Sequence, residues 1–174
     1  IYGDEGNDVT TFVNDGDDLI FGGAGDDFLS GGAGNDTISG DAGNDVVLGA
    51  DGDDTVTLGA AFGQENIWGG VAAETQGDLI DATGLTENVT ITFVGAETGT
   101  ISDGTSTASF SEIERIALGS GNDTVFGGAG NDVFVLQNLF ADRDNIRDYA
   151  VANDQLEVSR SVFGDFDNAG AVLA

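Results

Sequence analysis

The chain is dominated by a nine-residue repeat, which constrains its fold more than any other feature. Four units follow one another without a gap at residues 22–30, 31–39, 40–48 and 49–57. In the first unit, the turn-like stretch Gly22-Gly23-Ala24-Gly25-Asp26-Asp27 precedes Phe28-Leu29-Ser30, and the other three units keep this order of residue types. A short fixed period of this kind indicates a solenoid, in which each unit is stable only when stacked on its neighbours.

Further copies of the repeat lie on both sides of this block. Two looser units precede it at residues 3–11 and 13–21, and two more occur at residues 118–126 and 127–135. In all eight units the sixth position is Asp and the fifth is Asn or Asp. Thr10 is the exception at the eighth position, which is otherwise apolar: Ile20, Leu29, Ile38, Val47, Val56, Val125 and Phe134. Each unit is therefore predicted to form a turn followed by a short strand that directs one side chain inward.

Two units make one coil of turn, strand, turn and strand, so we expect residues two units apart to lie above one another. The predicted fold is all-β: a right-handed parallel β-roll (β-solenoid) with a degenerate central section and a C-terminal capping segment. The first array covers residues 1–57 and the second covers residues 118–135. Residues 58–117 are expected to be a degenerate or insert-bearing part of the solenoid, in which Gly77-Asp78-Leu79-Ile80 keeps a vestige of the repeat, and residues 136–174 to form the cap.

The charge of the chain limits its partners. Four basic residues face 32 acidic residues, which gives a formal net charge of −28. Phosphate binding requires basic patches, and an anionic membrane surface would repel such a chain, so we expect no nucleic-acid partner and no membrane partner. No apolar run approaches the roughly 20 residues that span a bilayer, so we expect no membrane insertion. Self-repulsion at this charge opposes compaction, and the folded state is expected to need bound cations.

Calcium is the cation that fits the repeat. Ca²⁺ prefers roughly six to eight oxygen ligands from carboxylates and carbonyls, which two stacked glycine-rich turns ending in Asp can supply. The lack of His and Cys argues against zinc or copper, and the octahedral demand of Mg²⁺ favours Ca²⁺. The predicted carboxylate ligands are Asp8, Asp18, Asp27, Asp36, Asp45, Asp54, Asp123 and Asp132. The predicted carbonyl ligands are those of Gly22, Ala24, Gly25, Gly31, Ala33, Gly34, Gly40, Gly43, Gly127 and Gly130.

Alternate units share an edge of the roll, so the sixth-position carboxylates of the first array should form two columns with four calcium sites between neighbours. One column comprises Asp8, Asp27 and Asp45, and the other comprises Asp18, Asp36 and Asp54. The alternative, a merely solvated acidic face, would leave stacked carboxylates repelling one another. The fifth-position acids Asp17, Asp26 and Asp53 are instead expected to face solvent or to hydrogen-bond the turn.

In the second array, Asp123 and Asp132 fall on opposite edges and need partners outside the regular repeat. Glu114 is predicted to lie beneath Asp132, and a residue within 142–148 is predicted to lie above Asp123. Asp148 and Asp154 are further candidate ligands.

The array resembles the RTX, or haemolysin-type calcium-binding, repeat family over residues 3–57 and 118–135. The stretch Phe110–Ile116 resembles the degenerate lead-in of such proteins, and Asp144–Val158 resembles their closing segment. The resemblance implies several bound Ca²⁺ ions, type I secretion from a Gram-negative bacterium, and folding at the cell surface or in the medium rather than in the calcium-poor cytosol. The chain departs from the family where the second-position glycine is replaced, by Asp4, Asn14, Asp41 and Ala50.

The residues do not predict an enzyme. The chain has no His for general-base chemistry and no Cys nucleophile, and its repeated equivalent Asp residues are unlike the two differently tuned acids of a glycosidase. We expect a structural or scaffold module of a secreted protein. The alternatives are an accessory module of a secreted protease, lipase or alginate epimerase, and an adhesin or surface-layer element.

One sheet should carry an apolar outer face that includes Val9, Phe28, Val46 and Leu48. Either residues 58–117 cover this face, or it contacts a neighbouring domain or subunit, because exposed apolar patches mark interaction sites. Trp68 is expected in core or edge packing.

Overall fold

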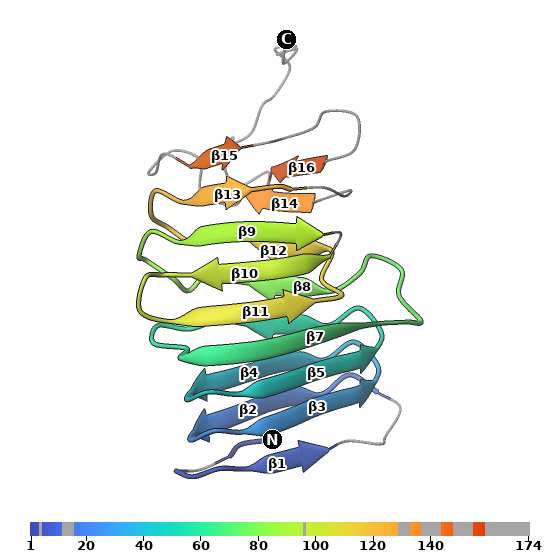
Figure 1. The fold of residues 1–174 in the computed structure, drawn as a ribbon. Helices are drawn as coiled ribbons and strands as arrows, with labels where there is room; N and C mark the ends of the chain where they lie inside the picture. The colour runs from blue at the N-terminus through green and yellow to red at the C-terminus, as the bar shows by residue number, and fades with distance from the viewer. Residues whose placement is uncertain are drawn as a thin grey trace, which may run out of the picture.

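The computed structural model describes residues 1–3, 5–11, 16–95, 97–128, 133–136, 144–147 and 155–158. The regular structure in these ranges is β-strand, arranged as two sheets that form the walls of one elongated stack (Figure 1). The first sheet contains, in chain order, β1 (Val9–Thr11), β3 (Phe28–Ala33), β5 (Val46–Asp51), β7 (Gln64–Ala72), β9 (Thr90–Gly95), β10 (Thr98–Ser102), β11 (Thr107–Ser111), β13 (Thr124–Phe126) and β15 (Asn145–Arg147). The second sheet contains β2 (Leu19–Ala24), β4 (Thr37–Ala42), β6 (Thr55–Thr57), β8 (Leu79–Asp81), β12 (Arg115–Ala117), β14 (Val133–Leu136) and β16 (Gln155–Val158). Within the described ranges there is no helix long and apolar enough to cross a membrane.

The coils of the first array stack in the register that the repeat predicts. Strands β2 and β4 pair in parallel with Ile20 opposite Ile38, and strands β3 and β5 pair in parallel with Leu29 opposite Val47. Residues 18 apart along the chain thus lie side by side, as the hydrogen bond between Asp27 and Asp45 also shows. The predicted all-β parallel solenoid is confirmed.

The eighth-position side chains form the core of the stack. Ile20, Leu29, Ile38 and Val47 have 0% of their surface exposed, while Thr10, the polar exception, is only partly buried. The ladder continues beyond the first array through Ile67, Ile80, Ile91, Ile116 and Val125. Burying such a side chain stabilises the fold by about 1.5–3 kcal/mol, so this one column per sheet is the main apolar contribution of each coil.

Residues 58–117 continue the stack, with one departure from parallel pairing. Strand β7 pairs in parallel with β5, and β8 pairs in parallel with β6. Strands β9, β10 and β11 form an antiparallel meander within the first sheet, in which β11 pairs in parallel with β7 and β9 with β13. The pairing is antiparallel here because the two residues between Gly95 and Thr98 allow only a hairpin, whereas a parallel connection needs a long crossover.

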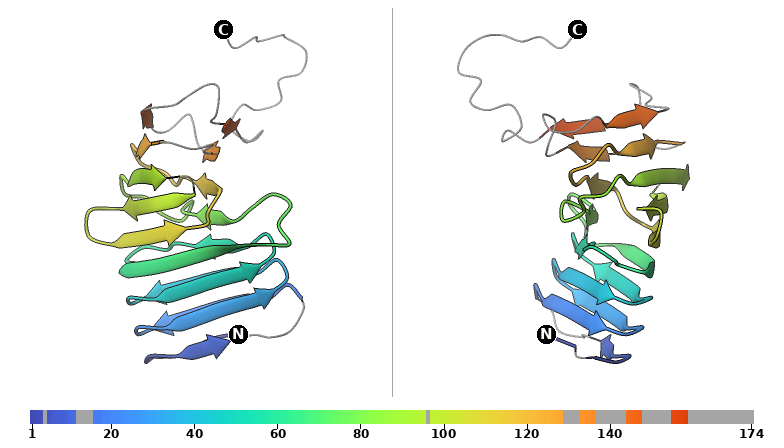
Figure 2. Two further views of the ribbon diagram at one scale, coloured as in Figure 1. Left: turned by 45° about the vertical axis from the view of Figure 1, so that its right-hand side comes forward. Right: turned by 90° about the vertical axis from the view of Figure 1, so that its left-hand side faces the viewer.

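The outer face of the first sheet stays uncovered by the rest of the described chain. Figure 2 shows that the central strands lengthen the stack and do not fold over its face. Phe28 is 36% exposed and Val9 is 76% exposed on this face. Trp68, which pairs across from Leu48, is 40% exposed rather than packed in the core. The prediction that residues 58–117 cover the apolar face is therefore wrong, because the free backbone edge of β5 pairs with β7 instead.

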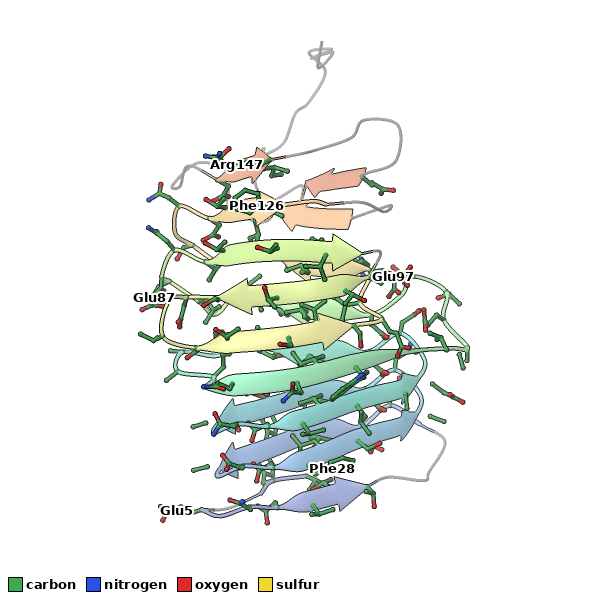
Figure 3. The ribbon with its side chains drawn as sticks, in the orientation of Figure 1. Glu5, Phe28, Glu87, Glu97, Phe126 and Arg147 are labelled. Atoms are coloured by element: carbon green, nitrogen blue, oxygen red, sulfur yellow. The ribbon has the colours of Figure 1, made fainter. Side chains whose placement is uncertain are left out.

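Near the other end of the stack, the same outer face carries Phe126, with the Arg147 guanidinium carbon 5.7 Å from its ring centre (Figure 3). Arg147 lies in β15, which pairs with β13, and β16 pairs with β14. The boundaries proposed at residues 57, 117 and 135, and the capping role of residues 136–174, stay predictions.

Candidate calcium sites

The turns at the two edges of the stack hold acidic residues in two columns. Figure 3 shows the two edges, with Glu87 at one and Glu97 at the other. The first column consists of Asp8, Asp27, Asp45 and Glu65. The second column consists of Asp18, Asp36, Asp54, Asp78 and Glu114. The structure thus stacks the predicted Asp residues of the first array as expected, and it adds members from residues 58–117 to both columns.

Each column is linked by hydrogen bonds from main chain to carboxylate. In the first column, the Asp8 amide donates to Asp27 Oδ1 at 2.7 Å, and the Asp27 amide donates to Asp45 Oδ1 at 2.8 Å. The same bond recurs along the second column at 2.8, 2.7, 2.7 and 2.6 Å, so that this column is unbroken from Asp18 to Glu114. One carboxylate oxygen of each acceptor is thereby fixed in position.

In five of these Asp residues, the other carboxylate oxygen lacks a protein partner. The Oδ2 atoms that are buried without a hydrogen bond belong to Asp27, Asp36, Asp45, Asp54 and Asp78. These five residues are at most 3% exposed. Leaving a buried anionic oxygen unsatisfied is costly, so each of these oxygens requires a proton or a cation.

In the regular repeats, each of these oxygens faces the first glycine of its own unit. A β-carbon on Gly31 would collide with Asp36 Oδ2 and would lie 2.9 Å from the carbonyl oxygen of Gly49 in the next coil. Since Gly31 does not have a positive φ, glycine is required at this position for space rather than for backbone conformation. Gly22 is surrounded in the same way by Asp27 Oδ2 and, at 2.7 Å, by the Gly40 carbonyl oxygen.

The space that a side chain would fill at these glycines suits calcium. Beside Gly22, Gly31, Gly49 and Gly69, this space is lined by a carboxylate oxygen and a carbonyl oxygen, which are the hard ligands that Ca²⁺ prefers. Within the described ranges, no group of three or more acidic side chains is placed to hold a metal ion by itself. Carbonyl oxygens from the turns would therefore have to complete the ligand shell of any bound ion.

The predicted carbonyl ligands are not all equivalent. The carbonyls of Gly22 and Gly40 lie beside the carboxylate column. The carbonyls of Ala24 and Ala33 instead accept hydrogen bonds from the amides of Gly6 and Gly16, both at 2.6 Å. Gly130 lies outside the described residues.

The second positions of the repeats adopt positive φ even where glycine is replaced. Gly32 has φ 105°, and the replacements Asp41 and Ala50 have φ 67° and 89°. This conformation costs a residue with a side chain about 1–2 kcal/mol. Asp41 and Ala50 therefore keep the turn geometry of the glycine that they replace, and their backbone is strained.

Fifth-position acids hydrogen-bond neighbouring turns. Asp17 Oδ1 accepts from the Asn35 amide at 2.9 Å, and Asp26 Oδ1 accepts from the Asn44 amide at 3.0 Å. Asp53 accepts from the Thr75 hydroxyl and from the amides of residues 75–77, and these bonds hold its pKa well below the usual range. These side chains hydrogen-bond the turns, as expected of residues that are not ligands.

Burial opposes ionisation within the columns. Burial raises the pKa of Asp54 to about 6 and that of Asp78 to about 8, with neighbouring carboxylates adding to both shifts. Burial and the negative charge of Asp45 raise the pKa of Glu65 to about 9. A divalent cation would supply the counter-charge that favours the ionised forms.

Sequence reasoning did not include two members of the columns, Glu65 and Asp78, among the candidate ligands. Glu65 ends the turn Gly63-Gln64-Glu65, which keeps the fourth-position glycine but carries Glu in place of Asp. Asp78 lies in the recognised vestige, but an insertion before it hides its place above Asp54. Glu114 lies directly above Asp78.

In the second array, the structure describes only part of the predicted set. The Asp123 amide donates to Asp144 Oδ1 at 3.0 Å, so the residue above Asp123 is Asp144. On its other side, Asp123 Oδ1 accepts from the amide of Val89, an apolar residue at the sixth position. Asp132, Asp148 and Asp154 lie outside the described residues.

Comparison with known families agrees with this geometry. The family described as RTX calcium-binding nonapeptide repeat (4 copies) matches residues 12–47, 30–61 and 110–136. Glu65 and Asp78 fall outside the matched residues. No curated protein matches the chain significantly. Residues 12–61 and 110–136 are thus RTX calcium-binding nonapeptide repeats, and they form part of a β-solenoid.

Proposed function

We propose that this chain is a structural module whose folding is driven by calcium bound between stacked turns. The observation that carries this proposal is the set of buried Oδ2 atoms without a hydrogen-bond partner, four of which lie with a main-chain carbonyl oxygen beside the same glycine. The first array would hold four ions, one between each pair of neighbouring Asp residues in the columns.

The energetics favour coupling of binding to folding. An ion that binds only the folded chain stabilises it by about 2.7 kcal/mol when its concentration is 100 times the Kd. Several such ions together match the roughly 5–15 kcal/mol that separates folded from unfolded states in typical domains. Without calcium, the net charge of −28 favours the expanded chain.

We further propose that the module works outside the cell, after export by a Gram-negative bacterium. Extracellular calcium modules have Kd values on the order of 10⁻⁴–10⁻³ M, so a low-affinity roll would stay unfolded in the cytosol and fold after export. An RTX β-roll is a structural calcium-binding fold rather than a catalytic one. The module would thus contribute a rigid scaffold to the protein that contains it.

Isothermal titration of the metal-free chain with CaCl₂, and separately with MgCl₂, tests this proposal. We expect saturable binding of several Ca²⁺ ions per chain and much weaker binding of Mg²⁺. Absence of calcium binding at millimolar concentrations, or equal binding of both ions, would overturn the proposal.

A further inference from the structure

The second column continues past the end of the regular repeats. A β-carbon on Gly49, in the last unit of the first array, would collide with Asp54 Oδ2 and would lie 2.6 Å from the Gly69 carbonyl oxygen. Gly69 therefore takes the place of a first-position glycine, although it lies outside the residues that the family matches, 12–61 and 110–136. The chain keeps the geometry of the repeat where its sequence pattern has stopped.

Gly69 itself faces the same two kinds of oxygen, one from a carboxylate and one from a main-chain carbonyl. A β-carbon there would collide with Asp78 Oδ2 and with the carbonyl oxygen of Glu112. Asp78 is 1% exposed, and its Oδ2 is buried without a hydrogen-bond partner. Glu112 adopts φ 58°, in the left-handed region, immediately after strand β11. A carboxylate and a carbonyl thus line the space beside Gly69, as they do beside Gly31.

The insertion before Asp78 brings a second acid to this place. Glu74 lies in that insertion, and its Oε1 is buried without a hydrogen-bond partner. Glu74 thus offers a second buried carboxylate oxygen, four residues before Asp78 in the chain. The regular repeats have no counterpart of this additional acid, because they lack the insertion.

We propose that the segment from Gly69 to Glu114 holds one further calcium ion, with Asp78 Oδ2 and the Glu112 carbonyl as ligands and with Glu74 as an additional carboxylate. This proposal rests on the proposed calcium-binding function but concerns residues outside the matched repeats. Because Glu112 directly follows β11, the ion would tie the antiparallel meander to the turn before β8. An added carboxylate raises the charge count of the site, which strengthens calcium binding.

The experiment is to count bound calcium by equilibrium dialysis of the full chain and of the variant Asp78→Asn. Asparagine keeps a side-chain oxygen for the Asp54 amide but removes the negative charge. The matched control is Asp81→Asn, which makes the same charge change at an acid that hydrogen-bonds Thr83. We expect Asp78→Asn to bind one ion fewer than the wild-type chain and Asp81→Asn to bind the wild-type number.

Equal ion counts for Asp78→Asn and the wild-type chain would overturn this inference and leave the proposed function intact. A wild-type chain that binds no calcium would overturn the proposed function itself. If Asp78→Asn does not fold, the variant Glu74→Gln decides the matter: we expect one ion to bind on the order of tenfold more weakly, since ligand charge sets affinity. Unchanged affinity of every ion in Glu74→Gln would then overturn the inference.

Discussion

Replacing Gly31 with alanine should remove one calcium ion from the second column. The new β-carbon would collide with Asp36 Oδ2, would lie 2.8 Å from Asp36 Cγ and would lie 2.9 Å from the Gly49 carbonyl oxygen. The Asp36 carboxylate cannot rotate away freely, because its Oδ1 accepts the Asp18 amide at 2.8 Å. The methyl group therefore occupies the space that the proposed ion and its ligands need.

The size of the effect follows from the loss of one bound ion. At a calcium concentration 100 times the Kd, losing a site costs about 2.7 kcal/mol of folding free energy. For a chain of this length, each kcal/mol lowers Tm by roughly 2–4 °C. We therefore expect Gly31→Ala to lower the Tm of the calcium-loaded protein by about 5–10 °C.

The assay is thermal unfolding followed by circular dichroism in saturating CaCl₂, together with an ion count by equilibrium dialysis. Gly59→Ala is the matched control, because a β-carbon on Gly59 would meet no heavy atom within 4 Å and its φ is not positive. We expect this control to change stability by no more than about 0.5 kcal/mol. If Gly31→Ala and Gly59→Ala have the same Tm and bind the same number of ions, the claim that Gly31 leaves space for a calcium ion is refuted.

Two further predictions follow from the columns and their turns. In the metal-free protein, a carboxyl group whose pKa is raised by folding stabilises the fold while it is protonated, so this stability is lost as pH rises. The pKa of Asp54 is about 6 and that of Asp78 is about 8. The β signal in circular dichroism should therefore grow as pH falls from 8 to 5, and Asp54 alone should contribute about 1 kcal/mol to the free energy of unfolding. A signal that is constant or that shrinks over this range would contradict the burial of these carboxyls. Ala50→Gly should raise the stability of the calcium-loaded protein by about 1 kcal/mol, because Ala50 has φ 89°. Chemical unfolding checks this against Ala42→Gly, a residue without positive φ, which should be neutral or destabilising.

The repeat determined what could be predicted about the first array. A nine-residue period allows only one way to stack a two-unit coil, so the pairing of Ile20 with Ile38 and the buried ladder followed from it. The role of the first glycine was less visible, because a sequence does not distinguish a glycine needed for positive φ from one needed for space. Gly31 is of the second kind.

The central section was harder to predict because insertions and deletions break the period while the backbone register persists. Glu65 and Asp78 occupy sixth positions only when their strands are aligned with β5 and β6. The meander carried one local signal, the turn at Asp103-Gly104, where Asp103 Oδ1 accepts from the amides of Thr105 and Ser106. The exposure of Trp68 depends on which sheet edge β7 pairs with, and residue types alone do not decide that.

The central claim is that calcium makes this fold, and far-ultraviolet circular dichroism of the metal-free chain at pH 8 tests it most directly. On addition of CaCl₂, we expect a spectrum of an unfolded chain to change to that of a β-protein, and a chelator should reverse the change. MgCl₂ at equal ionic strength should have little effect. An identical β spectrum in calcium and in chelator would contradict the account.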